Sequence, residues 1–169
     1  MRFRGRARKF GDHIDTDAIL PGRYLTDWNR DPKSLGRHCF ADFDPGFSSR
    51  VNPGDILVAG WNFGCGSSRQ AAAAALKAAG ISCLVAKSFA RIFFRNAINI
   101  GLPAVECPDL VEEATEGDLL EVAVDEGLLV NVSTGHRYSA GAFPPVVLEI
   151  LRQGGLVSYV RARLQAAER

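Results

Sequence analysis

The segment WNFGCGSSRQ holds the residues of this chain with the clearest capacity for chemistry. Gly64 and Gly66 allow the backbone to approach a ligand closely. Ser67 and Ser68 stand where unpaired amide groups converge at the N-terminus of a predicted helix, and Arg69 adds a planar guanidinium that matches a carboxylate or a phosphate. The pattern predicts a cradle for a small anion. A glycine turn with a serine N-cap and a solvated arginine would explain the same spacing.

Known anion-binding and catalytic loops do not match this segment. The second glycine is not followed by Lys and Ser or Thr, as in a P-loop, and the G-x-G-x-x-G pattern of dinucleotide-binding folds is incomplete. The G-x-S-x-G elbow of serine hydrolases is also absent. A small anionic substrate therefore remains the best candidate for the ligand.

Three carboxylates lie close together near the N-terminus, at Asp12, Asp15 and Asp17. Carboxylates at this density can bind a hard cation, but the ligand spacing of a calcium loop is absent. The alternative is that they form turns and helix caps, and that one of them pairs with an arginine of the cradle.

The elements around the cradle follow from the hydrophobic pattern. Residues 55–60 and 81–86 are short apolar runs bounded by turn residues, which predicts buried strands. Residues 68–79 hold five consecutive alanines and end at Gly80, which predicts a helix with a glycine C-cap. Strand, helix and strand in this order form a βαβ unit with a right-handed crossover.

The rest of the chain continues the pattern of an α/β protein. Residues 88–100 predict a second helix, capped by Ser88 and ended by Gly101. The remaining predicted elements are, in chain order, a strand over 103–107, a hairpin over 118–124 and 127–132, an apolar segment over 144–152 and a helix through Arg163. This mixture of βα units and a later hairpin favours an α/β fold with a mixed sheet or a small barrel.

Composition and charge agree with one globular domain over residues 1–169. Of these residues, 47% are hydrophobic and 23% are charged. The formal net charge of +1 is far from the strongly basic balance typical of nucleic-acid binding. No apolar run approaches the ~20 residues of a membrane helix, and the basic N-terminus lacks the apolar stretch of a signal peptide. We therefore expect a cytoplasmic protein with no membrane or nucleic-acid partner.

The cysteines are scattered along the chain, at Cys39, Cys65, Cys83 and Cys107, with no C-x-x-C pair among them. Their spacing fits neither a zinc site nor a disulfide framework. We expect free thiols in a reducing compartment and no metal site in this chain. Any metal chemistry would then be supplied by another protein.

Four motifs in a fixed order resemble the small subunits of 3-isopropylmalate dehydratases. They are GDHIDTDAILP at 11–21, RYL at 23–25, NFGCGSSR at 62–69 and KSFARIFFRNAINIGLP at 87–103. The wider group is the aconitase superfamily, which includes homoaconitase and dimethylmalate dehydratase small subunits. The resemblance extends from about residue 8 to the terminal helix, and the chain length suits a small subunit of this kind.

The resemblance implies a swivelling β/β/α domain that closes over a separate large subunit, which carries a 4Fe-4S cluster. It implies a hydro-lyase of leucine biosynthesis that removes water from a hydroxy-dicarboxylic acid and adds it back. By motif position, Ser67 corresponds to the base, Ser68 and Arg69 to binders of a substrate carboxylate, and Asp17 to an aspartate that we expect to orient the cradle. The assembly would be a heterodimer or heterotetramer, and the isolated chain could form a homo-oligomer.

The chain departs from the family pattern at two places. Relatives usually continue SSR with Glu-His-Ala, whereas Gln70 and Ala71 stand here and leave the local potential more positive. Thr26 and Asp27 occupy the loop that in relatives follows Tyr-Leu and faces the variable group of the substrate, where a homoaconitase-like enzyme would be expected to place an arginine. Asp27 would repel an additional carboxylate unless Arg30 reaches the site. We therefore expect Thr26 to face the small or apolar group of isopropylmalate, dimethylmalate or citramalate rather than a third carboxylate.

Two hypotheses from other functional classes remain. The altered Gln70 and Ala71 are compatible with a non-catalytic carboxylate-binding module that kept the fold. A self-sufficient hydrolase using Ser67 would need a histidine partner, and no histidine lies in a motif that would present one.

Overall fold

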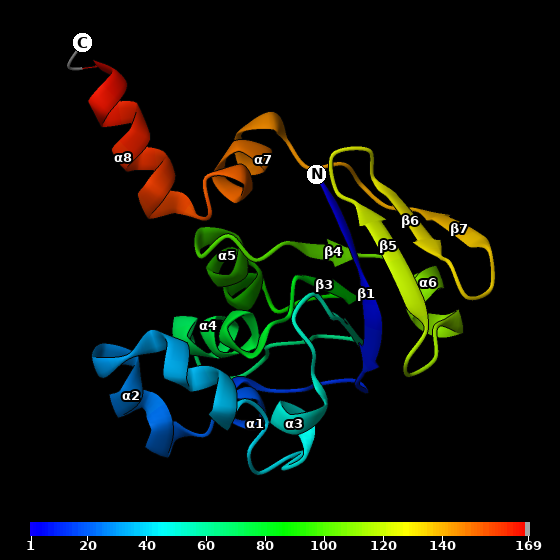
Figure 1. Cartoon of the computed structure of the whole chain (residues 1–169), viewed down its shortest axis with the longest axis horizontal. Coiled ribbons are helices and arrows are strands. Elements are labelled where there is room, and N and C mark those ends of the chain that lie inside the picture. Colours follow the sequence, from blue (N-terminus) through cyan, green and yellow to red (C-terminus); the bar gives the residue numbers. More distant parts are fainter. Residues whose placement is uncertain (168–169) are drawn as a thin grey trace.

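A seven-stranded mixed sheet forms the frame of the molecule, in the order β4-β3-β2-β1-β5-β6-β7. The computed structural model describes residues 1–167, apart from the side chain at position 29. Four strands are parallel, namely β1 (Arg2–Lys9), β2 (Ile56–Ala59), β3 (Cys83–Ala86) and β4 (Ala104–Glu106). Three continue the sheet in antiparallel fashion, namely β5 (Leu119–Ala123), β6 (Leu128–Asn131) and β7 (His136–Ser139). The predicted α/β fold with a mixed sheet is confirmed (Figure 1).

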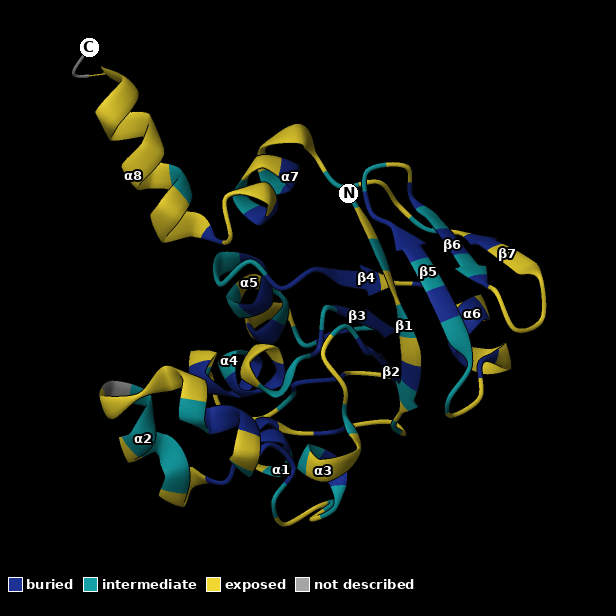
Figure 2. Cartoon of the chain, viewed as in Figure 1, coloured by how far each residue is buried: buried dark blue, intermediate teal, exposed yellow. Residues whose placement is uncertain are grey.

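Helices cover both faces of the parallel strands. The crossover helices are α4 (Gln70–Ala79), between β2 and β3, and α5 (Arg91–Asn99), between β3 and β4. Helix α6 (Pro108–Glu113) follows β4 and packs on the opposite face. Figure 2 shows the strands between these helices as almost continuously buried. The predicted βαβ unit is confirmed, and Gly80 ends α4 in the left-handed conformation at φ 106°.

Two hydrophobic cores lie on the two faces of the sheet because side chains alternate along a strand. In β2, Leu57 points into the core under α4 and α5, whereas Ile56 and Val58 point into the core under α6. In β3, Leu84 points into the core under α4 and α5, and Val85 points into the core under α6. Every residue of β2 and β3 is buried, which explains why their sequences are continuous apolar runs.

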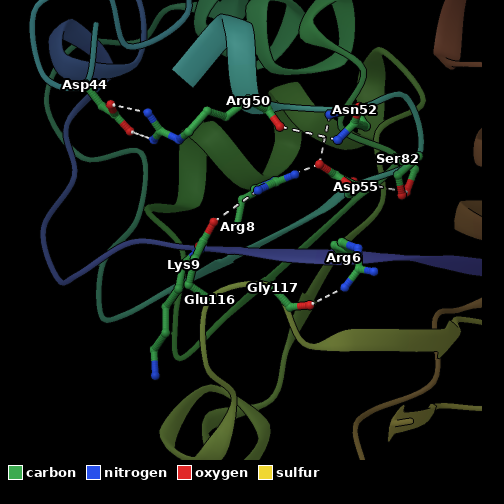
Figure 3. Close-up of polar contacts among 11 residues, drawn as sticks. Arg6, Arg8, Lys9, Asp44, Arg50, Asn52, Asp55, Ser82, Glu116 and Gly117 are labelled. Carbon is green, nitrogen blue, oxygen red and sulfur yellow. Dashed lines mark hydrogen bonds and ion pairs between the residues drawn. The ribbon is translucent and has the colours of Figure 1, made fainter. Parts of the chain in front are cut away.

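The central strand β1 was not among the predicted elements. Its sequence, RFRGRARK, reads as a basic tail, yet it pairs with β2 on one side and with β5 on the other. The guanidinium of Arg8 donates through Nε to Asp55 at 2.6 Å, and both side chains are largely buried, with exposed fractions of 14% and 5%. Arg8 also lies 3.2 Å from Glu116, which accepts a bond from the Lys9 amide at 2.6 Å (Figure 3). These pairs neutralise the positive charge and allow a basic strand to occupy the middle of the sheet.

Short helices fill the long connection between β1 and β2. They are α1 (Thr16–Ile19), the 3-10 helix η1 (Gly22–Tyr24), α2 (Leu25–Arg30), the 3-10 helix η2 (Pro32–His38) and α3 (Phe47–Arg50). Helix η2 packs closely on α4, where a Cβ on Gly36 would lie 2.5 Å from the backbone of Ala78. The segment expected to be a loop around Thr26 is therefore helical in the structure, because it packs against a neighbouring helix.

The predicted starts of the two crossover helices need correction. Helix α4 begins at Gln70, so Ser67 and Ser68 precede it rather than cap it. Helix α5 begins at Arg91, and Ser88 does not cap it. The Ser88 hydroxyl instead accepts a bond from the Asn62 amide at 2.8 Å, because the loop after β2 lies directly beside it.

The C-terminal helices lie at one end of the molecule. Helix α7 (Pro145–Arg152) packs on the body, and α8 (Leu156–Ala167) extends away from it with a mostly exposed surface (Figures 1 and 2). The expected hairpin and terminal helix are confirmed, whereas β7 was not predicted. No helix among residues 1–167 is both long enough and apolar enough to cross a membrane.

A test of the central strand is the variant Gly5→Ala. A Cβ at this position would lie 2.0 Å from the carbonyl oxygen of Gly54, in the turn before β2, so the backbone of one of the two segments must shift. We expect a loss of about 1–3 kcal/mol in the free energy of unfolding, measured by urea denaturation. Gly11→Ala is the control, because its added Cβ would meet no heavy atom within 4 Å. Equal losses for the two variants would contradict the close approach.

Candidate functional site

Three segments that carry the sequence motifs meet at one edge of the sheet. Residues 10–17 follow β1, residues 60–69 follow β2, and residues 87–90 follow β3. Because these strands are parallel, their carboxyl ends lie at the same edge, which is where open α/β sheets commonly bind ligands. The sheet therefore assembles motifs that are up to 75 residues apart in the chain, counted from position 12 to position 87.

The loop after β2 is the middle of these three segments and is hydrogen-bonded on both sides. On the β1 side, the Gly64 amide donates to Ile14 at 2.8 Å, and the Cys65 carbonyl accepts from Thr16 at 2.9 Å. On the β3 side, the Phe63 amide donates to the carbonyl of Ser88 at 3.0 Å. The backbone of the loop is therefore fixed by its neighbours.

The loop adopts left-handed backbone conformations at three positions, with φ values of 55° at Asn62, 78° at Gly64 and 86° at Gly66. A Cβ on Gly64 would lie 2.1 Å from Cγ of Phe93, so the ring of α5 packs directly onto the glycine. Gly66 has more space, because its nearest neighbour would be Cβ of Asp15 at 3.5 Å. Both glycines are required for the backbone conformation, and Gly64 is also required for packing.

Ser67 lies at the rim of a surface hollow of about 560 Å³. The lining residues come from the loop and from the start of α5, namely Asn62, Gly64, Gly66, Ser67, Ala90, Arg91, Ile92 and Arg95. The carbonyl of Ser67 accepts a bond from the hydroxyl of buried Thr16 at 3.0 Å, which fixes its backbone. Its own hydroxyl makes no hydrogen bond to the described residues and remains available to a ligand.

Arg69 lies beside the loop but does not line the hollow. Its Nη1 forms an ion pair with Asp17, the last carboxylate of the cluster near the N-terminus. The prediction that one of these aspartates pairs with an arginine of the cradle is therefore confirmed. The pair packs against Gly22, where an added Cβ would lie 3.6 Å from the guanidinium.

The other two aspartates accept backbone hydrogen bonds, one in a helix cap and one from the loop after β2. Asp15 caps α1 and accepts from the Ala18 amide at 2.7 Å, whereas Asp12 accepts from the Trp61 amide at 2.8 Å. Of the two interpretations of this cluster, the structure supports turns, caps and a pair with arginine.

Ser68 and Thr26 are exposed and do not line the hollow. Thr26 lies on α2, directly after the 3-10 helix that contains Gly22. Its neighbour Asp27 lies 3.4 Å from Nε2 of His38, the ring that stacks on Tyr24 with centroids 3.9 Å apart. Sequence reasoning did not find this contact, which gives Asp27 a local partner.

Arg91 and Arg95 line the hollow but were not among the predicted site residues. Both lie in the fourth motif, where they were assigned only to a predicted helix. Their spacing of four residues places them on the same side of α5. This spacing is the feature of the sequence from which the pair could have been predicted.

The cysteines do not form a metal site. Within residues 1–167, no group of three or more His, Cys, Asp or Glu side chains is arranged to hold a metal ion. Burial raises the pKa of the Cys39 and Cys83 thiols, which disfavours the thiolate form that binds metals. A 4Fe-4S cluster therefore does not fit the residues that this chain provides.

Comparison with known proteins identifies the family. Residues 33–110 match the family model of the Aconitase C-terminal domain. The crystal structure of a 3-isopropylmalate dehydratase from Methanocaldococcus jannaschii has a TM-score of 0.91 and 44% identity, with 100% of each chain covered. A 3-isopropylmalate dehydratase small subunit from Heliobacterium modesticaldum is 54% identical over 164 residues, which are 97% of this chain and 98% of that protein. The chain belongs to the 3-isopropylmalate dehydratase small-subunit family.

Family membership confirms the resemblance inferred from the four motifs. It also leaves the substrate open, because relatives of similar identity carry different names. A 2,3-dimethylmalate dehydratase small subunit from Eubacterium barkeri is 49% identical over 162 residues, which are 96% of this chain and 98% of that protein.

Alanine variants of three glycines test the strain in the loop. Gly66→Ala should lower the free energy of unfolding by about 1–2 kcal/mol, because a side chain at φ 86° is strained. Gly64→Ala should lower the free energy of unfolding by about 1–3 kcal/mol more than Gly66→Ala does, because its Cβ would overlap the ring of Phe93. Gly117→Ala is the matched control, since it has the same φ of 86° as Gly66 and open space around its Cβ. Urea denaturation compares the three, and a Gly64 loss no larger than the Gly117 loss would contradict the packing argument.

Proposed function

We propose that this chain is the small subunit of a 3-isopropylmalate dehydratase, a hydro-lyase that is active only with its large subunit. The observation that carries the proposal is the 54% identity, over 97% of the chain, to a protein of that name. The exposed Ser67 beside a hollow at the carboxyl edge of the parallel strands supports it, because the reaction needs a base beside a bound dicarboxylic acid.

Ser67 is the proposed base of the reaction. Its Oγ removes a proton from the carbon next to a substrate carboxylate, the electrons of that C–H bond form the double bond, and the hydroxyl on the neighbouring carbon leaves as hydroxide. The hydroxide and the removed proton together make up the water that is released. An unprotonated serine needs positive potential around it, and the guanidinium groups at the hollow supply it. Ser68 and Arg69 are the proposed binders of a substrate carboxylate, and Asp17 orients Arg69 through the ion pair described above.

The large subunit is the proposed source of the 4Fe-4S cluster. When bound, such a cluster supplies a Lewis acid that polarises the leaving hydroxyl group. The described residues of this chain offer no cluster site, so the chain contributes the base and the anion-binding groups. We propose that residues 1–169 act as one swivelling domain in a heterodimer or heterotetramer. The free thiols suit the cytoplasm as its location.

The substrate that we propose is 2- or 3-isopropylmalate, with dimethylmalate as the second candidate because of the Eubacterium barkeri relative. Thr26 is the proposed neighbour of the variable group of the substrate, since its helix begins next to the segment that contacts Arg69. A third carboxylate is disfavoured, because α2 carries Thr26 and the acidic Asp27 at the place where an arginine would be needed to hold it.

The variant Ser67→Ala tests the proposed function in the complex reconstituted with a cluster-bearing large subunit. Turnover of isopropylmalate should fall by about 10²–10⁴-fold with little change in substrate affinity, because a base acts mainly in the transition state. Ser158→Ala, on exposed α8, is the control and should keep full activity. The chain alone should show no turnover and no iron by quantitation. A wild-type complex that binds the dicarboxylate without turnover would support the non-catalytic module instead.

The variant Thr26→Arg tests the proposed substrate class. Wild type should have a higher kcat/KM for isopropylmalate than for homoaconitate. Thr26→Arg should reduce the ratio of these two values or reverse the preference. One charge-assisted contact to a carboxylate changes such a ratio by about 10- to 100-fold. Thr26→Gln is the control, because it adds length without charge. A wild-type preference for the tricarboxylate would contradict the proposed role of α2.

A further inference from the structure

Two arginines of α5 border the hollow that contains Ser67. Arg91 is the first residue of the helix and Arg95 lies about one turn later, so both guanidinium groups project from the same side. Both residues are exposed, and neither takes part in any ion pair or side-chain hydrogen bond of the described residues. The only other large side chain of α5 in this lining is Ile92.

The lining of this hollow is electrostatically unbalanced. It contains two guanidinium groups and no carboxylate. The same arginines also border a second hollow of about 540 Å³, which does contain the carboxylate of Glu106. Glu106 accepts a bond from the Phe89 amide through Oε1 at 3.1 Å, and it does not line the hollow that contains Ser67. The charged side chains that line the Ser67 hollow are therefore all cationic, which favours the binding of an anion there.

Arg69 alone cannot bind both carboxylates of a dicarboxylic acid. Its guanidinium is paired with Asp17, and it lies outside the lining of the hollow. A dicarboxylic acid carries two negative groups, and each needs a cationic or hydrogen-bonding partner when water is displaced. The cationic groups that line the hollow together with Ser67 are Arg91 and Arg95, and Asn62 adds a side-chain amide.

We propose that Arg91 and Arg95 form a second carboxylate-binding site, which holds one carboxylate of the dicarboxylic acid substrate next to Ser67. This inference rests on the proposed function and adds the residues that fix the orientation of the substrate. The two arginines hold the carboxylate from one side of the hollow, and the Arg69–Asp17 pair lies at the other end of the loop. The positive pair also supplies potential at the Ser67 hydroxyl, which favours its unprotonated form.

The test uses Arg91→Ala and Arg95→Ala in the complex reconstituted with the large subunit. The affinity for the large subunit is measured first, and kinetics are then recorded with the large subunit saturating. We expect each variant to raise the KM for isopropylmalate by about 10- to 100-fold, with a smaller change in kcat. Arg91→Lys should recover part of the loss, because it keeps the charge without the planar fork. Arg137→Ala, on the strand at the opposite edge of the sheet, is the control and should leave both constants unchanged.

A comparison of isopropylmalate with its two monomethyl esters distinguishes substrate binding from a structural effect. Wild type should discriminate against the ester whose blocked carboxylate would face Arg91 and Arg95, and the alanine variants should lose most of that discrimination. A variant that only disturbs the fold would lower activity toward all three compounds alike, and that result would overturn the inference.

The remaining outcomes separate the inference from the proposed function. If Arg91→Ala and Arg95→Ala weaken binding of the large subunit but keep the wild-type KM at saturation, the arginines are a subunit contact and the inference fails. If both behave like Arg137→Ala in an active complex, the inference also fails while the proposed function stands. A wild-type complex with no activity on isopropylmalate would contradict the proposed function itself.

Discussion

The hydrogen bonds that hold the loop after β2 between its two neighbouring segments are the constraint on which the site depends. Residues 61–66 bond to the segment after β1 on one side and to the segment after β3 on the other. Such a loop can satisfy both neighbours only by turning through left-handed conformations at Asn62, Gly64 and Gly66. The position of Ser67 follows from these bonds, since Thr16 anchors its carbonyl from the β1 side.

The sheet provides this arrangement because β1 joins its parallel and antiparallel halves. Strand β1 carries alternate arginines, and the deepest of them, Arg8, is matched by buried Asp55 and by Glu116. A buried charge pair of this kind adds little net stability, because the cost of desolvating both charges offsets their attraction. The parallel register places Lys9 beside Val58, so the segments that follow β1 and β2 begin side by side.

Charge is distributed unevenly around the loop. The N-terminal aspartates are used for caps, for a bond to the loop backbone and for the pair with Arg69, so none of them lines the hollow with Ser67. Arg91 and Arg95 of α5 line that hollow, and no carboxylate lines it with them. This separation suits the role of base that we propose for Ser67, because a carboxylate near Ser67 would repel an anionic substrate and raise the cost of ionising the serine.

The sequence by itself determined the parts of this protein that depend on local chemistry. Continuous apolar runs specified the buried strands β2 and β3, the alanine run and Gly80 specified α4, and the motif NFGCGSSR specified the loop and its glycines. The tertiary structure alone decided the rest. The basic segment RFRGRARK is a central strand in which Arg8 pairs with Asp55 and Glu116, both distant in the chain. Ser88 accepts a bond from the Asn62 amide rather than capping α5. Arg91 and Arg95 join Ser67 for the same reason: partners that are distant in the chain meet only when the parallel strands bring their ends together.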